Sequence, residues 1–266
     1  MFRPHDGRRV AVHPYRQMMT FLMRSRNESA VYFEQRLDLS KSLAWLEARK
    51  TKLFPLILHA LASTLHERER LNRFTVGRRT FQRNDVFLSF AAKKAMSDDA
   101  PLATVKRRFA RGETFGTLDA VLGDGIADAK SDKKSTIDKE LGVLLKLPGF
   151  LLVFLLGVMK RLYAWGLAPR SLVDSDPMYT SAFIANLGSI KIDAAYHHLY
   201  EHGTCPLFVT IGQVTQVPAV VDGALVARPM VTLRYSFDER VEDGLYCARA
   251  LKLFAERVED PASWIA

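Results

Sequence analysis

Two short segments carry most of the side chains that could do chemistry. The first, AAYHHLYEHG, holds His197, His198 and His202, three of the seven histidines in the chain. A neutral imidazole titrates close to pH 7, so it is a good general base under physiological conditions. The spacing of these histidines fits no standard set of zinc ligands, and we expect no metal site. Proton transfer, a packed loop and a subunit contact remain as roles for the segment.

The second segment, YSFDERVEDG, covers residues 235–244 and is rich in acidic side chains. Its first half alternates in polarity as a strand does, and its second half ends in a tight acidic turn. The pattern therefore predicts a strand, a short loop and then a new element.

The elements that must position these segments are short strands and amphipathic helices. Alternation at 31–39 predicts a strand, and apolar spacing predicts helices at 52–74 and 242–261. Val221-Asp222-Gly223-Ala224 has the composition of a hairpin turn. Further strands are expected within 78–94, 100–109, 180–188, 206–214, 216–226 and 229–238, and a polar helix within 112–140. The order predicts one α+β domain over residues 1–266, without repeats or linkers.

The charge of the chain is unevenly distributed. The net charge is +9, and residues 1–83 hold 17 Lys and Arg against 7 Asp and Glu, whereas residues 84–266 hold 21 against 22. The basic first third suits an anionic partner such as a membrane surface or the phosphates of coenzyme A, or it is a solvated face. Because no nucleic-acid-binding motif is present, we expect no nucleic acid partner. The two cysteines, Cys205 and Cys247, are expected to be buried reduced thiols of a cytoplasmic protein.

An apolar insertion at about 141–168 interrupts the pattern. Its centre, Leu147 to Met159, has 13 residues without a charge. A helix of that length is about 20 Å long, shorter than the roughly 30 Å hydrocarbon core of a bilayer. Lys160 and Arg161 follow at once with aromatic residues, a composition typical of a membrane interface. A helix buried in the core or in a subunit contact is the alternative.

The C-terminal sequence PMVTLRYSFDERVEDGLYCARALKLFAERVEDP resembles the C-terminal segment of dihydrolipoyl acyltransferases, the core component of 2-oxoacid dehydrogenase complexes. That family has a strand, then Asp-His-Arg-Val-x-Asp-Gly, then a helix ending in Glu-Asp-Pro; chloramphenicol acetyltransferase shares the His-x-x-x-Asp-Gly signature. FIANLGS is similar to the family turn Thr-Ile-Ser-Asn-Leu-Gly. SRNESAVYFEQRLDLS and FPLILHALASTLHERERLN are similar to its opening strand and first long helix. The likeness extends over about residues 14–262 and is weakest at 112–180.

The resemblance implies a two-layer α/β sandwich of the chloramphenicol acetyltransferase type, with a mixed sheet and helices on one side. It also implies a homotrimer whose active sites lie between subunits. In the family, a histidine of one subunit deprotonates a thiol or hydroxyl that attacks acyl-CoA. A serine or threonine near the Asn-Leu-Gly turn donates to the oxyanion, and an aspartate four residues after the histidine pairs with an arginine.

Several structural positions of the family are retained in this chain. Asp243 matches the structural aspartate, and Gly244 matches the turn glycine that follows it. Asn186 matches the asparagine of the family turn. Arg16, in HPYRQMM, is the expected partner of Asp243.

Both chemical positions depart from the family. Glu239 stands where the histidine is expected, and Ala185 stands where the hydroxyl is expected. A carboxylate of pKa about 4.3 is a poor base for a thiol of pKa about 8.5, unless burial raises the pKa of the carboxylate. One interpretation is a rebuilt site in which His197 or His198 supplies the base and Glu239 orients it. The other is a degenerate site with Glu239 in an ion pair with an arginine.

These interpretations predict two functions. The first is a coenzyme-A-dependent acyltransferase with a rebuilt active site that acts on a lipid-like acceptor. The alternative is a catalytically inactive trimeric scaffold or binding protein of the same fold. For both we expect a homotrimer or a higher assembly of trimers, with the loop around Glu239 in the subunit interface. No lipoyl group is expected on this chain, and the protein is expected to be cytoplasmic and peripheral at a membrane surface.

Overall fold

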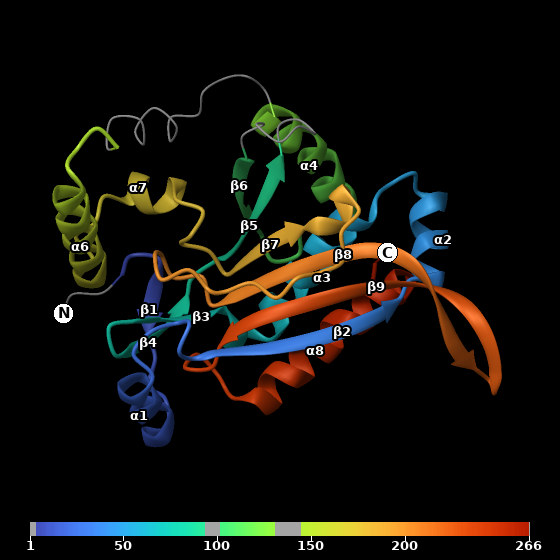
Figure 1. Ribbon diagram of the computed structural model, residues 1–266, viewed down its shortest axis with the longest axis horizontal. Helices are drawn as coiled ribbons and strands as arrows, with labels where there is room; N and C mark the ends of the chain where they lie inside the picture. The colour runs from blue at the N-terminus through green and yellow to red at the C-terminus, as the bar shows by residue number, and fades with distance from the viewer. Residues whose placement is uncertain (1–3, 94–101, 131–144, 266) are drawn as a thin grey trace.

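A mixed six-stranded sheet runs through the centre of the molecule, whose computed structural model describes residues 4–93, 102–130 and 145–265 (Figure 1). The strand order is β2-β9-β8-β7-β5-β6. Strand β7 is parallel to both of its neighbours, and all other pairs are antiparallel. The strands are β2 (Ala30–Asp38), β5 (Val86–Lys93), β6 (Leu102–Phe109), β7 (Ala182–Asn186), β8 (Leu207–Val221) and β9 (Ala224–Asp238).

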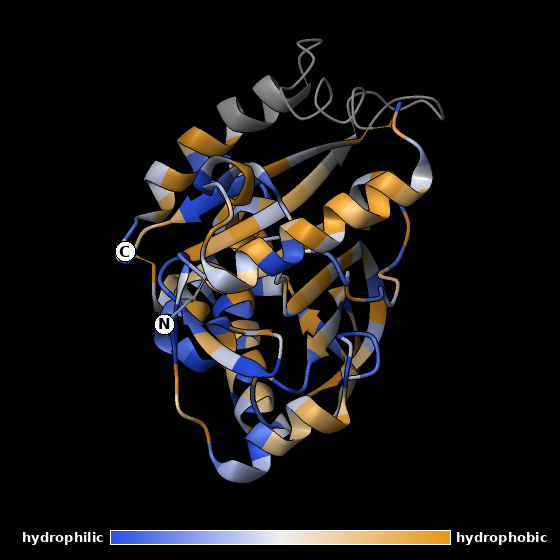
Figure 2. Cartoon of the chain, turned by 90° about the vertical axis from the view of Figure 1, so that its left-hand side faces the viewer, coloured by the Kyte–Doolittle hydropathy of each residue, from blue (hydrophilic) through white to orange (hydrophobic). Residues whose placement is uncertain are grey.

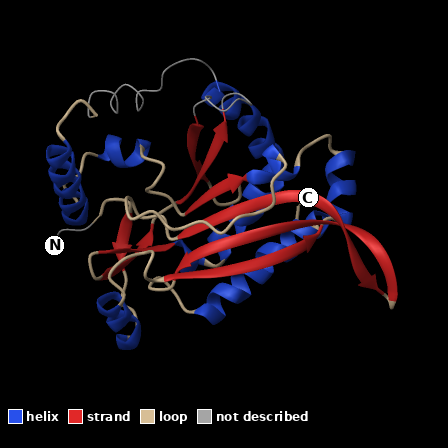
Figure 3. Cartoon of the chain, viewed as in Figure 1, coloured by secondary structure: helices blue, strands red, loops and turns tan. Residues whose placement is uncertain are grey.

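Helices cover one face of this sheet, as Figure 3 shows. The alternate residues Leu233, Tyr235 and Phe237 of β9 are buried in one hydrophobic core with the apolar sides of α3 and α8. The period-two pattern of the strand thus meets the apolar stripes of the helices. The predicted α+β class, with a mixed sheet and helices on one side, is confirmed. The helices of this layer are α2 (Ser40–Ala48), α3 (Leu53–Glu67), α4 (Phe115–Lys130) and α8 (Gly244–Glu259).

The opposite face of the sheet is covered by the loop that follows β7. Ser236 and Arg234 of β9 point away from the helices, and their side chains donate to the carbonyl oxygens of His197 and Ala194. Thr210 of β8 donates to another carbonyl oxygen of the same loop at 2.6 Å. The histidine-rich segment is therefore spread as a loop over β8 and β9.

A second, three-stranded antiparallel sheet lies at one end of the molecule (Figure 1). Its order is β1-β4-β3, so the strands expected within 78–94, here β4 and β5, belong to different sheets. Of the predicted polar helix at 112–140, the part beyond residue 130 lies outside the described residues. The elements at this end are β1 (Gly7–Arg9), α1 (Pro14–Leu22), β3 (Arg73–Val76), β4 (Arg79–Arg83), α6 (Gly149–Trp165) and α7 (Arg170–Ser175).

The predicted hairpin turn between β8 and β9 is confirmed. Asp222 and Gly223 have φ angles of 51° and 82°, so both adopt the left-handed region. Two consecutive left-handed residues form a type I′ turn, whose twist matches the twist of the flanking strands. The turn closes a long hairpin that extends beyond the helical layer (Figure 1).

Candidate active site

A buried ion pair fixes the loop between β9 and α8. Asp238 and Arg240 are 1% and 6% exposed, and the guanidinium Nε and Nη2 of Arg240 lie 2.9 and 2.8 Å from the two carboxylate oxygens. Ser29 donates a further hydrogen bond to Asp238 at 2.8 Å. The backbone N–H of Glu239 donates to the carbonyl oxygen of Ser29 at 2.9 Å. Glu239, the residue at the family base position, therefore lies between two buried residues that are paired with each other.

The next two acidic side chains of the loop are also paired. Glu242 is buried and accepts from Arg73 Nη1 at 2.9 Å. Asp243 is the N-cap of α8 and accepts from the N–H of Tyr246 at 2.8 Å. This hydrogen bond is the largest cause that holds the pKa of Asp243 below its ordinary value.

The structure corrects two structural roles expected from the family. Arg16 makes no direct hydrogen bond or ion pair with the Asp243 carboxylate, although its charge helps to lower the pKa of Asp243; its Nη1 donates to the carbonyl oxygen of Glu239 at 2.8 Å. The Asp243 carboxylate faces the first turn of α8 instead, because unpaired N–H groups of a helix start attract it. Gly244 is not a turn glycine here. It is the first residue of α8, has no left-handed φ, and an added Cβ would meet no atom within 4 Å.

The Glu239 side chain differs from the other acids of its loop. It is half-buried, and its carboxylate makes neither a hydrogen bond nor an ion pair with any residue that the structure describes. The expected ion pair with an arginine and the expected pair with His197 or His198 are therefore both absent from the described part of the chain. The carboxylate is left available for a group from outside.

The His197 ring is fixed by a backbone hydrogen bond and by an aromatic stack. Its Nδ1 lies 2.7 Å from the carbonyl oxygen of His198, and its ring stacks on Phe208 with centroids 3.9 Å apart. Because a carbonyl oxygen only accepts, Nδ1 carries the proton and Nε2 keeps its lone pair. Burial lowers the pKa of His197, although the hydrogen bond to the His198 carbonyl opposes the shift. The ring is therefore neutral near pH 7, with a basic Nε2.

The other two histidines of the segment are placed differently. The His198 side chain is exposed, and its Nδ1 lies 3.2 Å from the carbonyl oxygen of Leu199. His202 is bound to Asp176, with 2.5 Å between Nε2 and the carboxylate. His198 thus acts on its neighbour through its backbone carbonyl, and His202 fastens the loop to the segment after α7.

The turn after β7 is stabilised by Asn186 and Gly188. Asn186 accepts from the N–H of Ser189 at 3.2 Å and so caps the following 3-10 turn. A Cβ on Gly188 would lie 2.4 Å from the carbonyl oxygen of Gly212, so only glycine allows this approach of the turn to β8. Ala185, at the end of β7, offers no hydrogen-bond donor from its side chain.

Arg26 binds the backbone of the histidine-rich segment, a role that was not identified from the sequence. The Arg26 guanidinium is 6% exposed and donates to the carbonyl oxygens of Tyr200, Glu201 and Gly203 at 2.8, 3.0 and 2.5 Å. An arginine in the segment before a strand carries no local signal of this role, because its partners lie more than 170 positions away.

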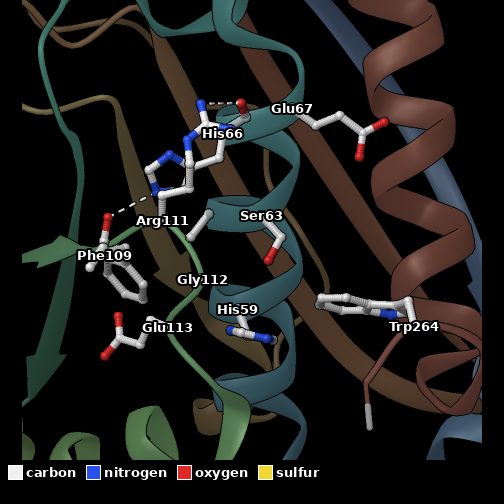
Figure 4. Close-up of a pocket in the computed structure, with 11 residues that line it drawn as sticks. His59, Ser63, His66, Glu67, Phe109, Arg111, Gly112, Glu113 and Trp264 are labelled. Carbon is white, nitrogen blue, oxygen red and sulfur yellow. Dashed lines mark hydrogen bonds between the residues drawn. The ribbon is translucent and has the colours of Figure 1, made fainter.

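A separate pocket of about 370 Å³ opens beside α3 (Figure 4). His59 lines it and stacks on Trp264, with ring centroids 5.0 Å apart, and burial lowers the pKa of His59. The acidic side chains of the pocket, Glu113 and Glu67, are paired with Arg107 and Arg257. The pocket contains none of the predicted site residues, so it lies outside the candidate active site.

Several known proteins are similar to this chain. Residues 170–266 match the family model of the 2-oxoacid dehydrogenases acyltransferase catalytic domain. The cubic core of the pyruvate dehydrogenase multienzyme complex is similar over 96% of this chain and 93% of its own, with a TM-score of 0.63 and 18% identity. A probable dihydrolipoamide acetyltransferase of Listeria monocytogenes covers 95% and 94%, with a TM-score of 0.59 and 16% identity. A chloramphenicol acetyltransferase covers 96% and 98%, with a TM-score of 0.58 and 12% identity. A search of curated proteins gave no match.

The chain has the dihydrolipoamide and chloramphenicol acetyltransferase fold. The family resemblance of its C-terminal third is thereby confirmed, and the likeness in fold extends over nearly the whole chain.

In this acyltransferase fold, one chain does not bring Glu239 and Ala185 together. Ala185 is opposite Thr210, which is opposite Arg234, five positions before Glu239. Five strand residues and two strand spacings correspond to about 19 Å. The two positions can share a site only if different copies of the chain contribute them.

Clustered metal ligands and membrane-spanning helices are both absent from the part of the chain that the structure describes. Nowhere in 4–93, 102–130 and 145–265 do three His, Cys, Asp or Glu side chains come together as a metal site would require. Within the same ranges, every helix is too short or too polar to cross a bilayer.

Proposed function

We propose that the protein is a coenzyme-A-dependent acyltransferase whose general base is His197 rather than the residue at the family base position. The observation that carries the proposal is the hydrogen bond from His197 Nδ1 to the His198 carbonyl at 2.7 Å. It selects the tautomer with a basic Nε2, in a ring whose pKa burial has lowered. The packing on Phe208 holds this ring in one orientation.

In the proposed reaction, Nε2 removes the proton from a thiol or hydroxyl acceptor. The acceptor attacks the thioester carbonyl of acyl-CoA, and the tetrahedral intermediate collapses with cleavage of the carbon–sulfur bond. The imidazolium of His197 returns its proton to the CoA thiolate. Ala185 supplies no oxyanion donor, so backbone N–H groups or another subunit must stabilise the intermediate, and we expect slow turnover.

We further propose that the active unit is a homotrimer. Helix α1 exposes Tyr15, Met18 and Leu22 by 66, 55 and 62%. The same helix places Arg16 on the Glu239 carbonyl, so its apolar side chains and the Glu239 loop belong to one surface. A subunit contact there would bury this surface. It would also bring the unpartnered Glu239 carboxylate to an adjacent subunit, where it could support the imidazolium of His197.

The acceptor is proposed to be lipid-like. The apolar insertion supports this class, because α6 exposes Phe150 and Phe154 by 78 and 64%. The acyl donor is proposed to be acyl-CoA, for which the basic first third of the chain offers electrostatic attraction.

The second candidate is a trimeric scaffold without catalysis. Ala185 and the position of Glu239 favour it, because neither family group with a chemical role is present. The two candidates differ in one measurable quantity, the release of CoA from acyl-CoA.

The test compares wild type with His197→Gln and His202→Gln, using acetyl-CoA and palmitoyl-CoA with thiol and alcohol acceptors, and chromatography to quantify CoA. We expect His197→Gln to lose about 10² to 10⁴ of the rate, the range typical of general base catalysis. His202→Gln is the matched control from the same loop, and it should retain activity. Equal rates for all three proteins would reject His197 as the base. The scaffold is favoured if an intact trimer gives no turnover with any donor.

A mixing experiment tests the shared site. His197→Gln and Glu239→Gln are each expected to be impaired, and statistical mixed trimers would have about one site in four with both groups intact. Recovery of about a quarter of the wild-type rate after co-refolding supports a site between subunits. No recovery from two impaired variants would show that both groups act within one chain, and an unimpaired Glu239→Gln would show that Glu239 has no role.

A further inference from the structure

Helix α6 is fixed to the molecule by one side only. Tyr163, near its C-terminal end, is 3% exposed and packs in a cluster with Phe74, Phe81 and Tyr179. The Tyr163 hydroxyl donates to Asp6 at 2.8 Å. This buried anchor sets the rotation of the helix, so the direction of its remaining faces follows from the fold.

The N-terminal half of the helix carries an exposed apolar surface, which we call the α6 face. It consists of Phe150, Val153, Phe154 and Leu156, which are 78, 73, 64 and 56% exposed. Figure 2 shows α6 as a largely hydrophobic helix on the outside of the molecule. Four large apolar side chains within two turns of helix form a patch whose exposure to water is unfavourable.

The charged residues on α6 and on the segments that flank it directly are cations. Residues 145–173 contain Lys146, Lys160, Arg161 and Arg170 but no aspartate or glutamate. All four cations are exposed, and none forms an ion pair within the described residues. An apolar surface bordered by unpaired cations is complementary to a layer of anionic headgroups over hydrocarbon.

We propose that the α6 face docks the protein on an anionic lipid bilayer. Lys146 precedes Phe150 by four residues and Lys160 follows Phe154 by six, so cations stand at both ends of the exposed apolar run. A helix that lies in the plane of the interface places Phe150 and Phe154 among acyl chains. Lys146, Lys160 and Arg161 then lie at the phosphates. The docking does not depend on the proposed catalysis.

The test is co-sedimentation of the full-length protein with vesicles of phosphatidylglycerol and phosphatidylcholine, and with phosphatidylcholine alone. We expect wild type to pellet with the anionic vesicles and to be released by high salt. Phe150→Glu with Phe154→Glu should weaken partitioning at least about tenfold, because two charges replace buried apolar groups. Lys160→Gln with Arg161→Gln removes no packing, and at about fivefold per cation it should weaken binding to the anionic vesicles only.

The matched control is Val220→Glu with Leu225→Glu on the β8–β9 hairpin, since each side chain is 74% exposed. It introduces the same charge change and should leave partitioning unchanged. The proposal is overturned if wild type stays in the supernatant with anionic vesicles, or if the control pair loses binding equally. It is also overturned if the phenylalanine pair changes the sedimentation coefficient without vesicles, which would show that a second copy covers the α6 face. Where circular dichroism shows that the phenylalanine pair is unfolded, the Lys160 and Arg161 variant decides.

Discussion

Neutralising Asp238 tests whether the loop of the candidate site depends on its buried ion pair. In Asp238→Asn the Arg240 guanidinium, 6% exposed, would remain in the interior without its counter-charge. Its two hydrogen bonds to residue 238, at 2.9 and 2.8 Å, would also be weaker, because a neutral amide would replace the charged carboxylate. Removal of one partner from a buried pair typically costs about 3–5 kcal/mol of the free energy of unfolding.

That cost predicts a clear change in melting temperature. An unfolding entropy of about 2.1 cal/mol/K per residue, over 266 residues, gives about 0.56 kcal/mol/K for the chain. The expected fall in Tm is therefore about 5–9 °C. Urea denaturation followed by circular dichroism at a fixed protein concentration measures the same change in free energy, and a constant slope would show that the unfolded state is unaltered.

Glu256→Gln is the matched control for this prediction. Glu256 and Lys252 form a helical pair of 3.8 Å whose side chains are 58 and 77% exposed. Exposed pairs of this type contribute about 0.5 kcal/mol or less. A loss of less than about 1 kcal/mol in Asp238→Asn would show that the buried ion pair does not stabilise the loop, contrary to the prediction.

Four further predictions concern titration, thiols and the base position. Burial lowers the pKa of His59 and of His197 in the folded state, so as the pH falls these histidines are protonated in the unfolded chain before they are protonated in the folded one. Their contribution to the free energy of unfolding is complete above about pH 6.5 and is lost below it. The urea midpoint should therefore drop from pH 7 to pH 5. Burial raises the pKa of Cys205 to about 11 and of Cys247 to about 12, so a thiol reagent at pH 8 should label neither until urea unfolds the protein. Glu239→Gln should change the free energy of unfolding by less than about 0.5 kcal/mol, because the carboxylate has no partner among the described residues; a larger loss by denaturation would reveal one. Glu239→His alone should not give strong acetyl transfer to dihydrolipoamide, because the oxyanion donor is still missing, and robust turnover with that acceptor would contradict a doubly altered site.

The strands and helices could be predicted because their signals are local. The alternation in β9 and the apolar spacing in α8 each indicate one buried face, and Asp222-Gly223 suits the left-handed turn between β8 and β9. The family motif at residues 231–258 then supplied the arrangement of these elements, which periodicity alone does not contain. The exposed apolar helix at α6 also followed from composition, since it has more apolar surface than its packing partners cover.

The sequence by itself determined the fold class, the altered residues Glu239 and Ala185, and the presence of a histidine-rich segment. Only the tertiary structure decided what each charged or basic group does. Asp238 ends β9 and Arg240 lies in the turn that follows, so the two are close in sequence, but their burial depends on Ser29 and Arg26 more than 200 positions away. The physical reason is that the polarity of a side chain depends only on its residue type, whereas its partners and its solvent exposure depend on distant segments that meet only in the folded chain.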